Sequence, residues 1–188
     1  MNGSRTACTI VLVAMAVSAA VVASGQQAPA PATRPTGKPP ALASGDREFI
    51  QTVAKGGMAE VALGELAGAR AANADVKQFG LRMVQDHGKA NEELAQLARD
   101  KRVEPPKEVD RTQKSVHDRL AKLSGDAFDR AYVEEMVKDH RKDVKEFERQ
   151  STRAKDTDLK AWVDKTLPTL RDHLKMIENI SAKVPAKK

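Results

Sequence analysis

The stretch FGLRMVQDHGKANEELAQLARD, residues 79–100, decides the fold of this chain. Its apolar side chains recur every three or four residues, which predicts an amphipathic helix with one face turned towards a core. That apolar face carries a histidine among hydrophobic residues: His87 with Phe79, Met83, Leu94 and Leu97. A histidine in such a place needs a partner, so this helix raises the question of function as well as of fold.

The Asp86-His87 dipeptide recurs twice, as Asp139-His140 and Asp172-His173, and each histidine again lies on an apolar face. The sequence MVQDHGK (83–89) matches MVKDHRK (136–142) closely. These matches suggest a duplicated helical hairpin in which the helices of His87 and His140 occupy equivalent places. Three histidines turned inwards from three helices either form a hydrogen-bonded layer or bind a metal.

The periodicity predicts an all-α chain with four long helices and one short one. Pro105-Pro106 ends the second long helix, because proline cannot continue a helix. Short connections make the first and second, and the third and fourth, long helices antiparallel hairpins, and the longer middle connection suits a crossover. This is a ferritin-like four-helix bundle with a short extra helix in the crossover, and the predicted helices are 46–72, 75–102, 110–123, 126–153 and 156–183.

The first predicted helix contains four glycines, although glycine costs about 1 kcal/mol relative to alanine in a helix. We expect close approach of a neighbouring helix to recover this cost through packing. The glycines are Gly56, Gly57, Gly64 and Gly68.

Outside the predicted bundle, which covers 46–183, the chain ends are of three kinds. Residues 1–23 resemble a secretory signal peptide, with one charge, a short apolar run and a small-residue cleavage site. Residues 24–45 form a Pro/Ala-rich linker, and 184–188 a basic tail. Cleavage would remove the single cysteine, Cys8, and leave no transmembrane domain, so we expect a periplasmic or otherwise exported protein. Retention of the first segment as an anchor is the alternative.

The net charge of +6 does not indicate nucleic-acid binding. The surplus comes from the chain ends, whereas the predicted bundle is formally neutral. A phosphate-binding face needs clustered positive charge, and aromatic residues, at 3%, are too few for a base-stacking platform. The basic residues at the ends are Arg5, Arg34, Lys38, Lys183, Lys187 and Lys188.

Glu60 lies in the least polar stretch of the first helix, where a carboxylate is costly to bury unless it is paired or metal-bound. With His87, His140 and His173 it would provide one metal ligand from each long helix. Imidazole and carboxylate ligands suit copper, zinc or iron. Two further groups would support such a site: Asp86, Asp139 and Asp172 as hydrogen-bond partners of the imidazoles, and Met83 and Met136 as soft neighbours favouring copper.

Two readings of these residues stay open. A layer of Asp–His pairs could fix the helix register without any metal, and methionine at helical spacing is usually core. A di-iron carboxylate centre is not predicted, because the Glu-x-x-His motif is missing: Val84, Val137 and Leu170 stand three residues before the histidines. The sequence also contains no recognisable nucleophile motif, so it does not predict an enzyme.

Several separated motifs resemble a bacterial envelope family known as domain of unknown function 4142, whose members are often labelled outer-membrane or exported proteins. The resemblance rests on GGMAE (56–60), MVQDH (83–87), FDRAY (128–132), Asp139-His140 and TLPTLRDH (166–173). It implies a ferritin-like bundle and an exported location but no activity.

The sequence therefore predicts a non-catalytic binding or stress-related module of the bacterial envelope, with an envelope protein or a second copy as partner. The alternative is a metal-binding redox or metal-handling protein that uses Glu60, His87, His140 and His173.

Overall fold

A computed structural model describes residues 42–184, and the predicted signal peptide and most of the predicted linker and tail lie outside this range. The described residues form helices and no strand, as predicted. The five helices are α1 (Ser44–Arg70), α2 (Ala74–Asp100), α3 (Arg111–Leu120), α4 (Gly125–Arg153) and α5 (Thr157–Ser181). Each predicted helix is present with its ends moved by a few residues, and Ser44 and Gly45 belong to α1 rather than to the linker.

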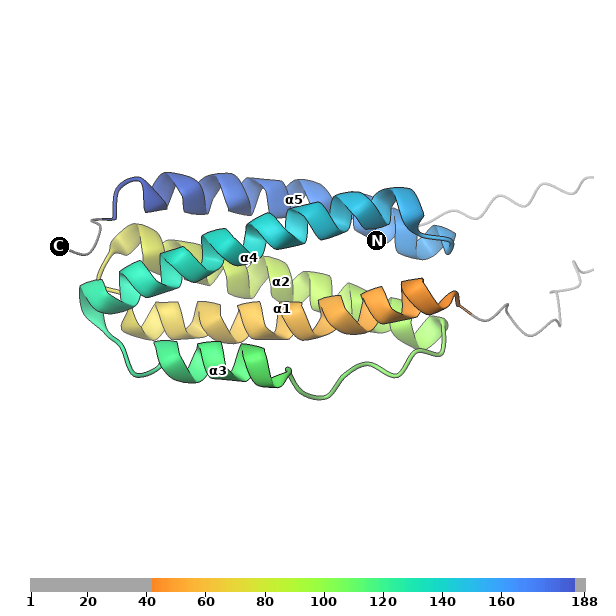
Figure 1. The fold of residues 1–188 in the computed structure, drawn as a ribbon, viewed down its shortest axis with the longest axis horizontal. Helices are drawn as coiled ribbons and strands as arrows, with labels where there is room; N and C mark the ends of the chain where they lie inside the picture. The colour runs from red at the N-terminus through yellow and green to blue at the C-terminus, as the bar shows by residue number, and fades with distance from the viewer. Residues whose placement is uncertain (1–41, 185–188) are drawn as a thin grey trace, which may run out of the picture. The chain divides into compact units, whose positions relative to one another are not determined.

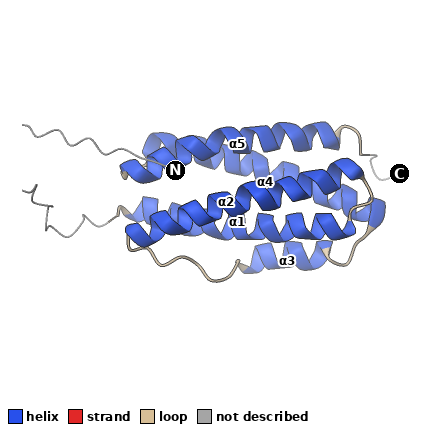
Figure 2. Ribbon diagram, turned by 180° about the vertical axis from the view of Figure 1, so that it is seen from behind, coloured by secondary structure: helices blue, strands red, loops and turns tan. Residues whose placement is uncertain are grey.

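The long helices form two antiparallel hairpins, α1–α2 and α4–α5 (Figures 1 and 2). α2 packs against α5 and α1 against α4, which closes the bundle. The segment after α2 runs back along the outside of the bundle, where α3 lies against α1, and delivers the chain to α4 at the opposite end (Figure 1). This is the crossover that the long middle connection predicted. Among the described residues, no helix is long and apolar enough to cross a membrane.

Local sequence explains where three of the helices begin. Asn73 caps α2 by accepting hydrogen bonds from the backbone N–H groups of the first turn, and Asp156 caps α5 in the same way. Asp110 and Gln113 form a reciprocal capping box at the start of α3.

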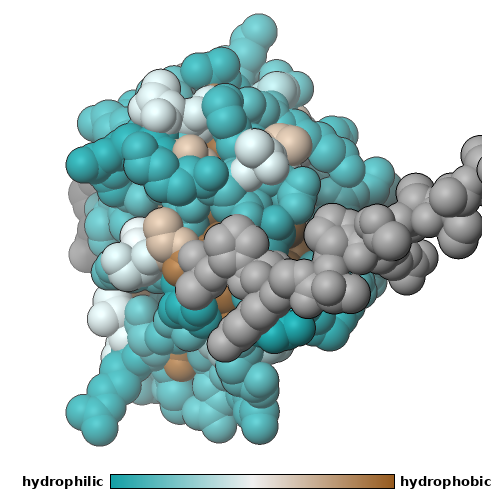
Figure 3. Space-filling model, turned by 90° about the vertical axis from the view of Figure 1, so that its right-hand side faces the viewer, coloured by the Kyte–Doolittle hydropathy of each residue, from teal (hydrophilic) through white to brown (hydrophobic). Residues whose placement is uncertain are grey.

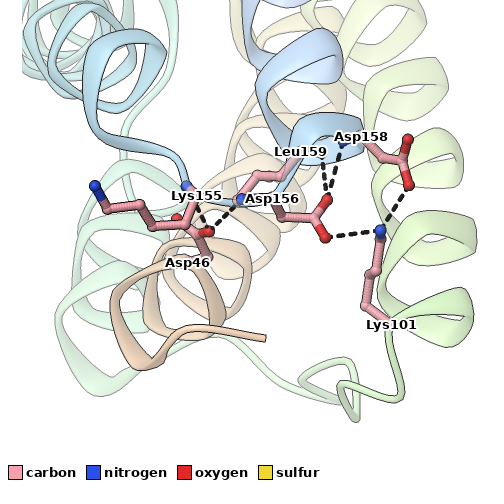
Figure 4. Close-up of polar contacts among 6 residues, drawn as sticks. All are labelled: Asp46, Lys101, Lys155, Asp156, Asp158 and Leu159. Atoms are coloured by element: carbon pink, nitrogen blue, oxygen red, sulfur yellow. Dashed lines mark hydrogen bonds and ion pairs between the residues drawn. The ribbon is translucent and has the colours of Figure 1, made fainter. Parts of the chain in front are cut away.

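Two buried aspartates join the hairpins at opposite ends of the bundle. The carboxylate of Asp46, near the start of α1, accepts hydrogen bonds from the backbone N–H groups of Lys155 and Asp156 in the α4–α5 turn (Figure 4). Asp129, near the start of α4, accepts from Ala72 and Asn73 in the α1–α2 turn. These reciprocal contacts relate α1 to α4 and α2 to α5. They do not relate α2 to α4, which the repeated MV-x-DH motif had suggested.

The glycines explain how closely α1 and α2 approach. A Cβ atom added to Gly64 would lie 2.6 Å from the carbonyl oxygen of Gly80, so the two backbones are in direct contact. Gly57 leaves room for the side chain of Asn91 on α2. The prediction of close packing is confirmed at these two positions and is wrong for Gly56, which has no neighbour within 4 Å.

The core consists of two hydrophobic clusters. The cluster at the end where α1 begins contains Phe49, Ile50, Leu94, Phe147 and Trp162, among others. The cluster towards the other end contains Leu63, Phe79, Met83, Tyr132 and Met136, among others. Figure 3 views the bundle from the end where α1 begins, and the surface that is coloured there is mainly hydrophilic. In each long helix, a short segment separates the residues of one cluster from those of the other, and that segment carries the candidate ligand.

Candidate metal centre

Four buried polar residues meet between the two hydrophobic clusters, one from each long helix. They are Glu60 of α1, His87 of α2, His140 of α4 and His173 of α5. Glu60 is only 2% exposed, and one ring nitrogen of each histidine lies within 4.8 Å of a ring nitrogen of the other two. The structure therefore brings together all four residues that the sequence singled out as ligands.

Each histidine uses one ring nitrogen for a different partner. Nδ1 of His87 donates to Oε2 of Glu60 at 2.9 Å, and Nδ1 of His140 donates to the backbone carbonyl of Met136 at 3.0 Å. Nε2 of His173 donates to Oδ2 of Asp86 at 2.8 Å, and Asp86 is also paired with Arg82. Because carbonyl and carboxylate oxygens only accept, these contacts assign the ring proton to the bonded nitrogen in each neutral imidazole.

The remaining ring nitrogens are buried and have no hydrogen-bond partner among the described residues. They are Nε2 of His87, Nε2 of His140 and Nδ1 of His173, and Oε1 of Glu60 is in the same condition. Oε1 of Glu60 and Nε2 of His140 lie 3.6 Å apart. Both are acceptors when the imidazole is neutral, so two lone pairs face each other unless a cation or a proton lies between them.

The electrostatics of the four residues are unequal. Burial opposes ionisation of Glu60, but the charge and hydrogen bond of His87 outweigh it and lower the pKa of Glu60 to about 2. Burial likewise disfavours the charged form of His87, yet Glu60 outweighs this effect and raises the pKa of His87. Burial dominates at the other two histidines, lowering the pKa of His140 and lowering that of His173 to about 4. Ionised Glu60 thus favours the proton on the neighbouring His87, whereas burial favours the neutral forms of His140 and His173.

The predicted supporting aspartates behave differently from one another. Asp86 of α2 holds the imidazole of His173 on α5, across a helix interface. Asp139 and Asp172 make no hydrogen bond to a histidine among the described residues. Asp172 is exposed, whereas Asp139 faces Glu60. Met83 and Met136 are fully buried in the hydrophobic cluster that contains Phe79.

Sequence reasoning missed Asp143, which lies one turn after Asp139 on α4. One carboxylate oxygen from each of Glu60, Asp139 and Asp143 lies within 4.8 Å of the others. Burial and the charge of Glu60 raise the pKa of Asp139 to about 6, and the same causes raise that of Asp143 well above its usual value. The four-residue spacing was visible in the sequence, but it acquires meaning only once α1 places Glu60 opposite.

The comparisons with known proteins agree with this fold. The family model described as domain of unknown function 4142 matches residues 31–180. The chain belongs to this family. None of the curated proteins compared with it matches.

Several solved structures are similar to the chain at low sequence identity. A DUF305 fragment from Deinococcus radiodurans superposes with a TM-score of 0.68 at 12% identity, over 77% of this chain and 99% of the other. CopM in its Cu(I)-bound form superposes with a TM-score of 0.62 at 16% identity, over 73% of this chain and 96% of the other. CopM in its apo form gives 0.63, again at 16% identity, over 75% and 98%. At these identities the similarity shows the shared helical-bundle fold.

Proposed function

We propose that this chain is a metal-binding protein that holds one copper ion at His87, His140 and His173, with Glu60 as the fourth ligand, and that it handles the metal rather than catalysing a reaction. The observation that carries the proposal is the convergence of the three histidines, each with a buried ring nitrogen that has no partner, and an unpartnered Glu60 oxygen 3.6 Å from Nε2 of His140. Leaving such atoms unpaired costs about 1–3 kcal/mol each, and a single cation would satisfy all of them.

The spacing of the acceptors suits a small metal ion. Ligands at about 2.0–2.2 Å from a tetrahedral centre lie roughly 3.3–3.6 Å from one another. The distance of 3.6 Å between Oε1 of Glu60 and Nε2 of His140 falls at this value. One ring nitrogen of each histidine lies within 4.8 Å of those of the other two, so full coordination requires these nitrogens to move closer together.

The second ring nitrogens support the same proposal. In metal sites, ligating imidazoles usually donate the other N–H to a carboxylate or a backbone carbonyl, which orients the ring and makes it a better ligand. His87, His140 and His173 each make such a contact, to Glu60, Met136 and Asp86 respectively. A hydrogen-bonded layer without metal would instead be expected to pair the inward nitrogens as well.

Copper is favoured over zinc and iron for two reasons. Imidazole ligands suit all three metals, but thioethers favour copper, and Met83 and Met136 are buried one helical turn before His87 and His140. CopM, which shares the fold, has structures with Cu(I) and with Cu(II) bound. A metal-handling role also agrees with export, which the sequence of residues 1–23 predicts.

The second candidate is the non-catalytic binding module that the sequence suggested first. It requires an exposed apolar patch of several hundred Å² on which a partner could dock. Within residues 42–184, Leu81 is the one exposed large hydrophobic side chain, at 52%. This scarcity supports the metal-binding proposal over a hydrophobic docking surface.

The experiment that tests the proposal is a copper titration of the purified chain, with metal content measured by mass spectrometry. The wild type is expected to retain one copper per chain, and the double variant His87→Ala/His140→Ala to retain none. His117→Ala is the matched control, because His117 lies on α3 outside the cluster and its removal should leave copper content unchanged.

Two results would overturn the proposal. Absence of stoichiometric copper from the wild type after titration would leave the histidines as a structural layer. Equal copper content in the wild type and the double variant would place the metal elsewhere. Glu60→Ala sharpens the distinction, since loss of stability without loss of copper would make Glu60 a partner of His87 and not a ligand.

A further inference from the structure

A cavity of about 180 Å³ adjoins the histidine cluster. Its walls come from α1, α2, α4 and α5, and the first residues of α3 lie along it. Glu60 and His87 contribute to its lining, so the cavity connects with the candidate copper site. Its other charged residues are four acids and two lysines, and three of the lining carboxylates lie close together: Glu60, Asp139 and Asp143.

These three carboxylates have fewer partners than buried acids usually have. The ion pairs of Glu60 are to His87 and His140 alone among the described residues, and Oε1 of Glu60 is buried without a hydrogen bond. Asp139 and Asp143, both half-buried, make no hydrogen bond or ion pair within residues 42–184. Lys55 and Lys142 also line the cavity, but within residues 42–184 neither forms an ion pair with any of the three.

The arrangement has the dimensions of a hard cation site. Carboxylate oxygens bind calcium at 2.3–2.6 Å, so oxygens on opposite sides of an ion lie up to about 5 Å apart. The oxygens of this cluster lie within 4.8 Å of one another. Carboxylate ligands select magnesium, calcium and manganese over the softer metals that imidazole and thioether prefer.

We propose that Glu60, Asp139 and Asp143 form a second cation site, which takes a hard divalent ion such as Mn²⁺ at the inner end of the cavity beside the histidine cluster. The geometry that carries this inference is the convergence of one carboxylate oxygen from each of the three residues beside a cavity of about 180 Å³, together with a Glu60 side chain that is almost fully buried and keeps one oxygen without a hydrogen bond. The site goes beyond the proposed copper function, since it uses two residues outside the copper ligands and a different class of metal. Glu60 lies between the two sites and links them.

The test is a Mn²⁺ titration of the full mature chain, followed by electron paramagnetic resonance of the free ion, with and without one equivalent of Cu(I) under argon. The wild type should bind one Mn²⁺ in both conditions, because Cu(I) prefers the soft ligands. Asp143→Asn, which keeps the size of the side chain, should weaken Mn²⁺ binding at least tenfold. Asp172→Asn is the control, because Asp172 is an exposed carboxylate on α5 outside the cluster.

His173→Ala separates this inference from the proposed copper function, because His173 contacts Asp86 and none of the three carboxylates. It should lose copper and keep Mn²⁺. Loss of both metals in His173→Ala would place Mn²⁺ in the histidine cluster and overturn the second site. Absence of saturable Mn²⁺ binding in the wild type would do the same.

The alternative role for these three carboxylates is an entry route for copper, and the same variants test it. In that case Asp143→Asn would slow copper loading while its Mn²⁺ affinity remained equal to that of Asp172→Asn, and the second site would be refuted. Circular dichroism of each variant checks the fold, and Asp139→Asn replaces Asp143→Asn if the latter does not fold.

Discussion

The two helical hairpins are alike at their ends and different in their middles. Asp46 of the first hairpin accepts hydrogen bonds from the turn of the second, and Asp129 of the second accepts from the turn of the first. Asn73 and Asp156 cap the helices that follow these turns, and Asn73 lies as many residues after Asp46 as Asp156 lies after Asp129. Inside, α1–α2 closes through backbone contact at Gly64, whereas α4–α5 is filled by larger side chains such as Phe147 packed on Trp162. The contacts at the ends of the bundle therefore align the two hairpins with each other. The interior of the first hairpin provides Glu60 and His87, and that of the second provides His140 and His173.

The largest expected effect comes from removing the carboxylates that join the hairpins. Asp46→Ala should lower the free energy of unfolding by about 3 kcal/mol, because it strands two backbone N–H groups and the side-chain amide of Gln150. Asp129→Ala should lower it by about 2 kcal/mol, because it strands two N–H groups. Urea unfolding of both variants measures the difference, and equal losses would show that the Gln150 contact contributes nothing.

A slightly smaller effect is expected at the glycine contact that distinguishes the first hairpin. Gly64→Ala should destabilise the protein by about 2 kcal/mol, because the added methyl group overlaps the Gly80 carbonyl and must separate α1 from α2. Gly56→Ala is the control on the same helix. It meets no atom within 4 Å and should raise stability by up to about 1 kcal/mol through helix propensity. If Gly64→Ala proved as stabilising as Gly56→Ala, the close contact would be refuted.

In the metal-free protein, the pKa of His87 in the first hairpin and that of His173 in the second should be shifted in opposite directions. Burial lowers the pKa of His173 from 6.5 to about 4 in the folded protein. As the pH falls, the unfolded chain therefore binds a proton at His173 before the folded protein does. Stability should therefore fall as the pH drops from about 6.5 towards 4, and His173→Gln should reduce this dependence. His87, whose pKa is raised by Glu60 against burial, contributes stability below 6.5 that is lost as the pH rises through its raised pKa.

Imidazole NMR titration of the metal-free protein provides the direct check. His87 should retain its proton to a higher pH than a free histidine, and His173 should lose its proton at a lower pH. Coincident titration of the two would contradict the asymmetry between the hairpins. With copper bound, both should stop titrating until acid displaces the metal, because protons and metal compete for the same nitrogens.

The smallest effects are expected from the surface ion pairs between α2 and α5. Lys101 contacts Asp156 and Asp158 at one end of the bundle, as Figure 4 shows, and Lys183 contacts Asp75 at the other. Lys101→Ala should lower the free energy of unfolding by about 0.5 kcal/mol, because exposed pairs contribute little. Lys183→Ala, which removes a single and more exposed contact, should change it less. Thermal unfolding of both variants at low salt measures the two changes in stability. Both changes should become smaller at high salt, because salt screens exposed ion pairs.

Much of the fold could be predicted because helical periodicity is a local property. Pro105-Pro106, the cap at Asp156 and the spacing of Phe79, Met83 and His87 each act within a few residues. The buried roles of Asp46 and Asp129 could not be predicted in this way. Their partners are turns of the other hairpin, which only the packing of the bundle brings close.

For the candidate site too, part could be predicted from the sequence and part could not. The apolar neighbourhoods of Glu60, His87, His140 and His173 marked them as buried polar residues, and burial follows from the helical pattern. Which atoms meet does not follow from it. Asp86 belongs to His173 and not to His87, and Asp143 joins Glu60, because side chains on different helices pair according to helix position and rotation about the bundle axis.

By itself, the amino-acid sequence determined that this chain forms four long helices, that each carries a candidate ligand on its apolar face and that the glycines of the first helix permit close packing. These properties depend on spacing along one helix. The tertiary structure alone decided that the four polar residues share one layer between two hydrophobic clusters, and that their buried atoms without partners lie close together beside a polar cavity. Such contacts depend on the relative register of helices far apart in the sequence, which the reciprocal caps at Asp46 and Asp129 help to hold.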